Sequence, residues 1–349
     1  MKLAIVLFNL GGPDRPEAVR PFLENLFSDP AIINLPAFVR RPLAKFIAAR
    51  RTPLARGFYD QIGGRSPILP ETEAQARALE TALVRTGHTA KCFIAMRYWH
   101  PMTRETVAAV RSFQPDRIVL LPLYPQYSTA TTRSSLEEWR REAKRQRLTA
   151  QTHEVCCYPF EAGFVAALTE MLNDALAHAK PGIEYRVLFS AHGLPKRMIE
   201  RGDPYQWQVE RTVEAILARL TLKDIDYTIS YQSRVGPLEW IGPDTDAEVR
   251  RAGADGKGLI VIPVAFVSEH SETLYELDIA YGKLARETGV PDYIRVPTAR
   301  TQRPFIEALA SLVGLALGSK GPVSCAPGRI CPRDRVCGQD EQGGGAKDA

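Results

Sequence analysis

Short apolar runs recur along this 349-residue chain and constrain its fold more than any other feature. Each run is continuous and rich in Val, Ile, Leu or aromatic residues, as strands are when a parallel sheet is covered on both faces. The runs are Leu3–Phe8, Ala90–Ala95, Ile118–Leu123, Tyr185–Ser190, Tyr227–Tyr231 and Leu259–Phe266. Helical patterns separate them, at Pro70–Thr86, Ser134–Arg147, Phe164–His178, Pro204–Arg219 and Ser271–Glu287. The alternation predicts an α/β protein with helices on both faces of parallel sheets.

A weak internal echo indicates two similar halves. The segments Leu7–Pro13 and Leu188–Pro195 each place a polar turn and a proline directly after an apolar strand. Ligands of open α/β sheets bind at the carboxyl ends of the strands, so two halves that meet at a cleft would fit. We expect a first lobe at residues 1–155 and a second at 156–318, whose last helix returns toward the first. The tail at 319–349 loses periodicity, and we expect its end to be disordered.

Composition excludes several classes of function. The net charge of +5, from 45 basic and 40 acidic residues, is too small to indicate a nucleic-acid-binding protein. No run of about 18 apolar residues is present, so no transmembrane helix is expected. The run Met1–Phe8 is short and no small-residue cleavage site follows it, which favours a buried strand over a signal peptide. We therefore expect a cytoplasmic protein. Gly11-Gly12-Pro13 lacks the G-x-G-x-x-G form, so no nucleotide cofactor is expected.

One histidine follows the fourth apolar run, in the segment Ser190–Pro195. A neutral imidazole accepts a proton near pH 7 and binds borderline metal ions. His192 is therefore a candidate for catalysis or metal binding. The alternative is a turn histidine that bonds only to its own backbone.

Three glutamates follow the last apolar run. Glu269, Glu272 and Glu276 are spaced i, i+3 and i+7, so a helix that included all three would present them on one face. The helix dipole favours acidic residues only in the first turn, so stability explains part of this pattern. A solvated acidic face is the alternative. A histidine and an acidic helix, each at the carboxyl end of a strand, would suit metal handling coupled to proton removal.

These segments belong to a longer series of blocks. The series is Leu7–Pro13, Arg50–Pro53, Tyr59–Ile68, Met96–Pro101, Tyr124–Ser128, Ser190–Pro195, Arg201–Tyr205, Tyr231–Pro237, Trp240–Pro243 and Phe266–Asp278. In number and order the blocks resemble those of protoporphyrin ferrochelatases along nearly the whole chain.

The resemblance implies two Rossmann-like lobes, each a parallel sheet flanked by helices, with the active site in the cleft between them. It implies that His192 and Glu272 face each other at the porphyrin centre. There they would remove pyrrole protons or bind and deliver Fe²⁺. Glu269 and Glu276 would form an acidic path behind Glu272. Porphyrin-contacting positions of the family match Leu10, Arg51, Tyr59, Ser66, Arg97, Tyr98 and Trp240.

The stretch at residues 30–59 contains basic and apolar residues but, after Asp29, no acidic one before Asp60. A basic amphipathic segment can lie on an anionic membrane surface. It can also bind the propionate carboxylates of a porphyrin. An ordinary helix with a basic solvent face is the third interpretation. The resemblance favours a lip of the active site in peripheral contact with the inner face of the membrane.

Three cysteines, Cys325, Cys331 and Cys337, fall within thirteen residues near the end of the chain. Such a cluster needs a fourth ligand to hold a [2Fe–2S] centre or zinc, and Cys156 and Cys157 offer one. Some ferrochelatases carry a [2Fe–2S] cluster on three C-terminal cysteines and one internal cysteine. The spacing here is wider than in the animal enzymes, and the choice between Cys157, slightly preferred, and Cys156 stays open. A reduced tail without metal is the alternative.

The resemblance implies a lyase-class ferrochelatase that inserts Fe²⁺ into protoporphyrin IX and releases two protons, the terminal step of haem biosynthesis. Coproporphyrin III is the alternative substrate. Two further candidate functions are a non-catalytic carrier of tetrapyrrole or iron and a chelatase for another metal, such as cobalt. The presence of both His192 and Glu272 favours an enzyme over a carrier. The sequence carries no signal for the oligomeric state.

Overall fold

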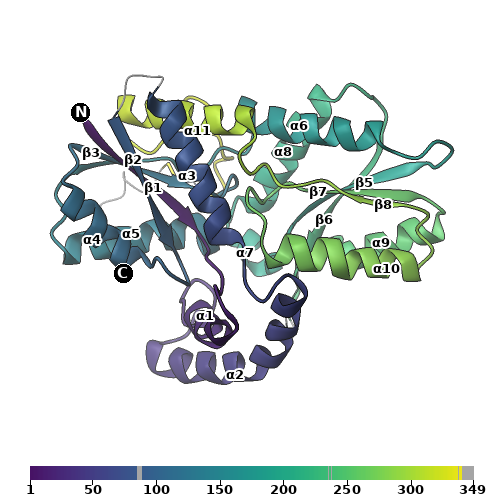
Figure 1. Cartoon of the computed structure of the whole chain (residues 1–349), viewed down its shortest axis with the longest axis horizontal. Helices are drawn as coiled ribbons and strands as arrows, with labels where there is room; N and C mark the ends of the chain where they lie inside the picture. Colours follow the sequence, from purple (N-terminus) through teal and green to yellow (C-terminus); the bar gives the residue numbers. More distant parts are fainter. Residues whose placement is uncertain (85–88, 235, 237, 337, 340–349) are drawn as a thin grey trace. The chain divides into compact units, whose positions relative to one another are not determined.

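The computed structural model describes residues 1–84, 89–234, 236, 238–336 and 338–339. The chain divides into two units. One consists of Met1–Cys157, Leu309–Gly328 and Gly338–Ala349, and the other of Tyr158–Ala308 and Arg329–Cys337. Each unit contains a four-stranded parallel sheet flanked by helices (Figure 1). This arrangement confirms the predicted α/β class.

The sheet of the first unit has the strand order β2-β1-β3-β4. Its strands are β1 (Lys2–Asn9), β2 (Thr89–Met96), β3 (Arg117–Pro122) and β4 (Gln151–Glu154). The first three match predicted strands to within one residue at each end. The edge strand β4 was not predicted, because it spans four residues and its sequence, Gln-Thr-His-Glu, is polar.

The helices of this unit are η1 (Pro16–Ala18), α1 (Val19–Phe27), α2 (Ala37–Gln61), α3 (Ile68–Val84), α4 (Thr103–Phe113), the π-helix η2 (Thr129–Arg133), α5 (Ser134–Arg145) and the later part of α11 (Arg303–Gly318). α4 and α5 share one core with the sheet, in which the ring of Phe8 meets the ring of Trp139 edge-on at 5.9 Å. This core fixes the carboxyl end of β1.

The basic stretch at residues 30–59 lies largely in α2. Its inner face packs on α1 through a small core that contains Val19, Leu23, Ala48 and Tyr59. Its outer face exposes Phe38 and Phe46, whose residues are 80% and 59% accessible. The helix is therefore amphipathic, but its exposed face is itself partly apolar.

The sheet of the second unit has the strand order β6-β5-β7-β8. Its strands are β5 (Tyr185–His192), β6 (Asp226–Gln232), β7 (Gly258–Pro263) and β8 (Tyr293–Arg295). β5 runs two residues beyond its predicted end and so includes His192. β7 stops at Pro263, three residues before the predicted Phe266. β8 was not predicted, because three residues are too few for a pattern.

Helices cover both faces of this second sheet, α6 and α8 on one and α9 and α10 on the other (Figure 1). The helices of the unit are α6 (Ala162–Ala177), α7 (Lys196–Glu200), α8 (Tyr205–Arg219), α9 (Thr245–Ala254), the π-helix η3 (Glu272–Ala280) and α10 (Tyr281–Glu287). The predicted α-helix over Ser271–Glu287 is therefore wrong for its first part, which is a π-helix. Among the described residues, no helix is both long and apolar enough to cross a membrane.

Candidate active site

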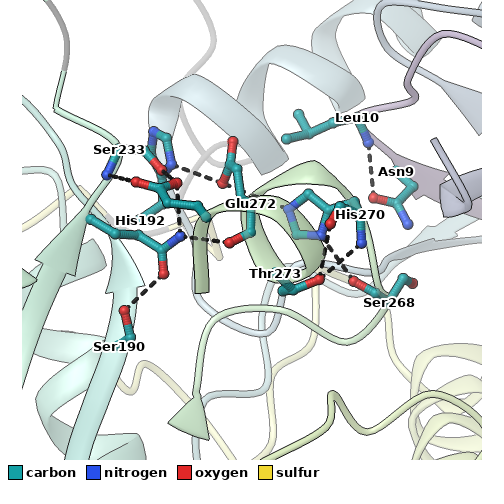
Figure 2. Close-up of polar contacts among 11 residues, drawn as sticks. Asn9, Leu10, Ser190, His192, Ser233, Ser268, His270, Glu272 and Thr273 are labelled. Carbon is teal, nitrogen blue, oxygen red and sulfur yellow. Dashed lines mark hydrogen bonds and ion pairs between the residues drawn. The ribbon is translucent and has the colours of Figure 1, made fainter. Parts of the chain in front are cut away.

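A histidine and a glutamate meet at the carboxyl end of the second sheet. His192 is the last residue of β5, and Glu272 is the first residue of η3, which follows β7 after a short turn. Nδ1 of His192 lies 3.0 Å from Oε2 of Glu272 (Figure 2). Both side chains keep some contact with solvent, at 35% and 28% of their surface. The pair is therefore held by the fold and still accessible to a small ion.

The π-helix brings a second carboxylate to the same place. Hydrogen bonds of a π-helix join residue i to i+5, so its turns are wider than those of an α-helix. Glu276 follows Glu272 by four residues, nearly one such turn, and its pKa is affected by the charges of Glu272 and His192. Its oxygens accept hydrogen bonds from the Ser233 backbone at 2.8 Å, the Ser233 hydroxyl, and Tyr281 at 3.2 Å. Glu276 is thus fixed behind the His192–Glu272 pair.

The local electrostatics shift the pKa values of the Glu272 and Glu276 carboxyl groups in opposite directions. Burial alone would raise the pKa of Glu272, but the charge of His192 and their hydrogen bond lower it well below its ordinary value. Burial raises the pKa of Glu276, and repulsion by Glu272 raises it further. Burial would lower the pKa of His192, but Glu272 raises it. Paired groups whose pKa values are driven apart are a mark of acid–base sites.

A second histidine, His270, lies on the other side of Glu272. Its Nδ1 donates to the carbonyl of Ser268 at 3.0 Å, which leaves Nε2 facing Oε2 of Glu272 at 3.6 Å. Because Nδ1 holds the proton of the neutral ring, Nε2 is the atom that can take up another. Glu272 therefore lies between two imidazoles.

Glu269 does not share a helical face with Glu272 and Glu276, as the i, i+3, i+7 spacing predicted. It precedes the helix and is 6% exposed. Its Oε1 accepts from Nη1 of Arg295 at 2.7 Å and from the backbone N–H of Thr298 at 3.0 Å. Burial alone would raise the pKa of Glu269, but Arg295 and these hydrogen bonds lower it. The helix begins only at Glu272, so the helical spacing does not extend back to Glu269.

Six of the predicted porphyrin-contacting residues lie in the first unit, and two of these form one network. Nη2 of Arg97 lies 2.7 Å from Oδ2 of Asp29, and the hydroxyl of Tyr98 donates to the same oxygen at 2.9 Å. Asp29 is 4% exposed. A buried carboxylate thus fixes both side chains.

The other four are spread over the first unit. Leu10 directly follows the last residue of β1, and its backbone N–H donates to the side chain of Asn9. Arg51 lies 5.7 Å from the ring of Phe27, and burial lowers its pKa. Tyr59 and Ser66 are both buried. In the second unit, Trp240 forms a β-bridge with Pro195, three residues after His192.

The cysteines lie in both units. Cys156 and Cys157 are buried, with their Sγ atoms 3.2 Å apart, so the two thiols do not point to opposite faces as a strand would place them. A parallel β-bridge joins Val155 to Val323.

Cys331, in the second unit, accepts a hydrogen bond from Gln208 at 3.2 Å. Cys337 lies outside the described residues, as do positions 340–349. Among the described residues, no group of three or more Cys, His, Asp or Glu is arranged to hold a metal ion.

Sequence reasoning missed four polar residues of the site: Ser190, Gln232, Ser233 and His270. The signals were present. Gln232 and Ser233 follow an apolar strand as His192 does, and Ser190 and His270 lie within two residues of a predicted site residue. Their buried hydrogen bonds, however, depend on which strands become neighbours.

Comparison with known proteins decides the family. The ferrochelatase family matches residues 2–316. The chain belongs to the ferrochelatase family. It is 54% identical over 334 residues to a ferrochelatase of Phenylobacterium zucineum, covering 95% of this chain and 96% of the relative. A ferrochelatase of Caulobacter vibrioides is 54% identical over 336 residues, with the same coverage. One of Pelagibacter ubique is 49% identical over 315 residues, covering 90% and 91% of the two chains.

These matches confirm the family predicted from the sequence, and with it a metal chelatase of haem biosynthesis. Ferrochelatases use Fe²⁺ as a substrate. The ion is therefore a reactant here and not a resident cofactor.

Two solved structures share the fold. SirB from Bacillus subtilis with Fe³⁺ has a TM-score of 0.52 and 14% identity, covering 90% of this chain and 96% of its own. The sirohydrochlorin chelatase SirB from Bacillus subtilis subspecies spizizenii in complex with cobalt has a TM-score of 0.50 and 13% identity, with 89% and 93% covered. The fold of this ferrochelatase is thus that of other chelatases.

Proposed function

We propose that the chain inserts Fe²⁺ into protoporphyrin IX to form protohaem, the terminal step of haem biosynthesis, by lyase-type chemistry. The observation that carries the proposal is the partly exposed pair of His192 and Glu272, whose pKa values are shifted in opposite directions. The reaction exchanges two pyrrole protons for one divalent ion, so it needs a base and a route for the protons.

His192 is the proposed base. Its Nδ1 faces Glu272, so Nε2 is the nitrogen that would take a pyrrole proton. The ionised carboxylate stabilises the imidazolium that results, as the raised pKa of His192 indicates. The same two side chains offer one nitrogen and one carboxylate oxygen, donors that suit Fe²⁺ during its transfer.

The groups behind the pair would carry the protons away. Glu272 lies between His192 and His270, and Nε2 of His270 can take a proton from the carboxyl group. Glu276 has a raised pKa and would hold a proton in exchange with Glu272. Glu269 contributes less directly, since it is engaged with Arg295.

The two candidate porphyrin substrates differ in the side chains of the macrocycle. Leu10, Arg51, Tyr59, Ser66, Arg97, Tyr98 and Trp240 are the proposed porphyrin-contacting residues. Protoporphyrin IX carries two propionates and coproporphyrin III four, so a competition experiment separates the two proposals. Equal amounts of both porphyrins are incubated with the protein and Fe²⁺ without oxygen, and the two haems are quantified. Excess protohaem supports the proposal, and excess coprohaem replaces it with the alternative substrate.

We also propose that Cys325, Cys331 and Cys337, with Cys157 as the fourth ligand, hold a [2Fe–2S] cluster. Cysteine thiolates are a suitable donor set for such a cluster, and Cys157 and Cys331 are buried. Cys156 is the alternative fourth ligand. The parallel bridge between Val155 and Val323 supports Cys157, because two residues further along both segments the same register aligns position 157 with position 325. When bound, the cluster would cross-link the tail to the body of the protein.

The exposed face of α2 is the proposed contact with an anionic membrane, which would place the protein in the cytoplasm at the inner membrane face. Phe38, Phe46 and Leu54 are exposed on this helix, and Arg41, Lys45, Arg50 and Arg56 are exposed among them. Apolar side chains that enter the interface and basic ones that meet anionic headgroups are the two features of a surface-bound helix.

A further inference from the structure

Gln232 connects the two strands that end at the active site. It is the last residue of β6 and pairs in register with His192, the last residue of β5. Its backbone carbonyl accepts from the N–H of Gly193 at 2.8 Å. Both Gln232 and its neighbour Ser190 are completely buried. The position of Gln232 is therefore fixed by its strand pairing and its burial.

The side-chain amide of Gln232 has one favourable orientation. Its Oε1 accepts from the hydroxyl of Ser190 at 2.7 Å. Its Nε2 donates both of its protons, to the backbone carbonyl of Glu272 at 3.0 Å and to Oε2 of Glu276 at 3.1 Å. The reversed amide would place its oxygen against a carbonyl and a carboxylate, which are both acceptors. The two acceptors of η3 thus determine which end of the amide faces them, and the hydroxyl of Ser190 donates to the other end.

This amide joins the strand end to both glutamates of η3. One bond holds the backbone at Glu272, where the π-helix begins, and the other holds the carboxylate of Glu276. Because Gln232 is also in register with His192, the distance between His192 and Glu272 depends on it. We propose that Gln232, held by Ser190, is a positioning residue that keeps Glu272 and Glu276 aligned with His192 during metal insertion. The inference rests on the proposed function and assigns a role to residues that do not touch the reacting atoms.

The test compares three variants of the full-length protein. Gln232→Leu keeps the side-chain size and removes all three side-chain hydrogen bonds, and Ser190→Ala removes only the one between Ser190 and Gln232. Ser230→Ala is the matched control, since Ser230 is a fully buried hydroxyl on the same strand that bonds to Thr245 at 3.0 Å and lies outside the site. Iron insertion is measured without oxygen as kcat and as KM for the porphyrin, and thermal unfolding confirms that each variant is folded.

We expect Gln232→Leu to lower kcat by up to about 100-fold, because small displacements of catalytic groups have effects of this size. Ser190→Ala should lower it about fivefold, the equivalent of one hydrogen bond. KM should stay within about twofold in both, and Ser230→Ala should retain wild-type kcat. Since Ser190 acts through Gln232, a fourth protein, the Ser190→Ala/Gln232→Leu double variant, should be no slower than Gln232→Leu alone.

Three results would overturn the inference: a folded Gln232→Leu with wild-type kcat, losses that multiply in the double variant, or equal losses in Ser190→Ala and Ser230→Ala. A wild-type protein that inserts no iron would instead overturn the proposed function. The two failures are therefore distinguishable.

Discussion

Nδ1 of His192 lies 3.0 Å from Oε2 of Glu272, although the two residues are 80 positions apart in the chain. Parallel strands β5 and β7 are neighbours in the sheet, so the segments that leave their carboxyl ends meet at one edge. The fold therefore brings a histidine and a glutamate into a partly exposed pair.

Replacement of the two glutamates of η3 should have unequal effects. Glu272→Ala removes the carboxylate that contacts His192 and should lower kcat for iron insertion by about 100-fold or more, with the fold intact. Glu276→Gln should cost less, because it lies behind the pair. Steady-state kinetics and circular dichroism provide the measurement. Glu287→Ala, at the exposed end of α10, is the control. Equal losses of kcat in Glu272→Ala and Glu276→Gln, or no loss in Glu272→Ala, would contradict this order of effects.

Glu269 should stabilise the fold in a pH-dependent way. Its pKa is lower in the folded protein than its ordinary value of 4.5, so its stabilising contribution is present above that pH. The contribution disappears as the pH falls through the lower folded value. Glu269→Gln should therefore have a lower Tm than the wild type at pH 7, and the difference should shrink below about pH 4.5. Thermal unfolding from pH 7 to pH 3 measures this. A difference that grows on acidification would disprove the role assigned to Arg295.

The cysteine tail should hold iron and sulfide. The purified protein should be red-brown with a [2Fe–2S] absorption spectrum, and its Tm should fall when the cluster is lost. Single Cys→Ser variants at 156, 157, 325, 331 and 337 are assayed for iron and acid-labile sulfide, with Cys92→Ser as the control. We expect iron and sulfide to be lost in the variants at positions 157, 325, 331 and 337. A colourless, active wild type without iron or sulfide would refute the cluster. Loss at the tail positions but at neither 156 nor 157 would refute only the fourth ligand.

The exposed face of α2 should bind anionic vesicles. Co-sedimentation with vesicles that contain phosphatidylglycerol should fall several-fold in the Phe38→Ser/Phe46→Ser variant and in high salt, which screens the basic residues. Leu315→Ser, another exposed apolar residue, is the matched control and should bind as the wild type does. Binding that is equal for neutral and anionic vesicles, or unchanged in the double variant, would argue against this surface.

The strands that carry the site could be predicted because buried strands have a simple sequence pattern. The runs at 3–8 and 185–190 are continuous and apolar, and a strand covered on both faces requires this. The site histidine followed from its place after such a run. The short edge strands β4 and β8 were missed because they bury too few residues to show a period.

The π-helix could not be predicted, because its residues have an ordinary helical pattern and its wider turn depends on contacts from other segments. Gln232 bonds to the carbonyl of Glu272 from a strand 40 residues away. The turn that carries Glu269 toward Arg295 depends likewise on β8, which was not expected. Local spacing predicts which residues share a helix only where the helix has been located correctly.

Iron insertion by the wild type and by His192→Ala tests the central claim most directly. Both proteins are incubated with protoporphyrin IX and Fe²⁺ without oxygen, and protohaem and released protons are measured together. The account predicts that the wild type forms protohaem with two protons released for each iron inserted, and that His192→Ala forms it at least about 100-fold more slowly. Full activity of His192→Ala, or a wild type that metallates neither protoporphyrin nor coproporphyrin, would contradict it.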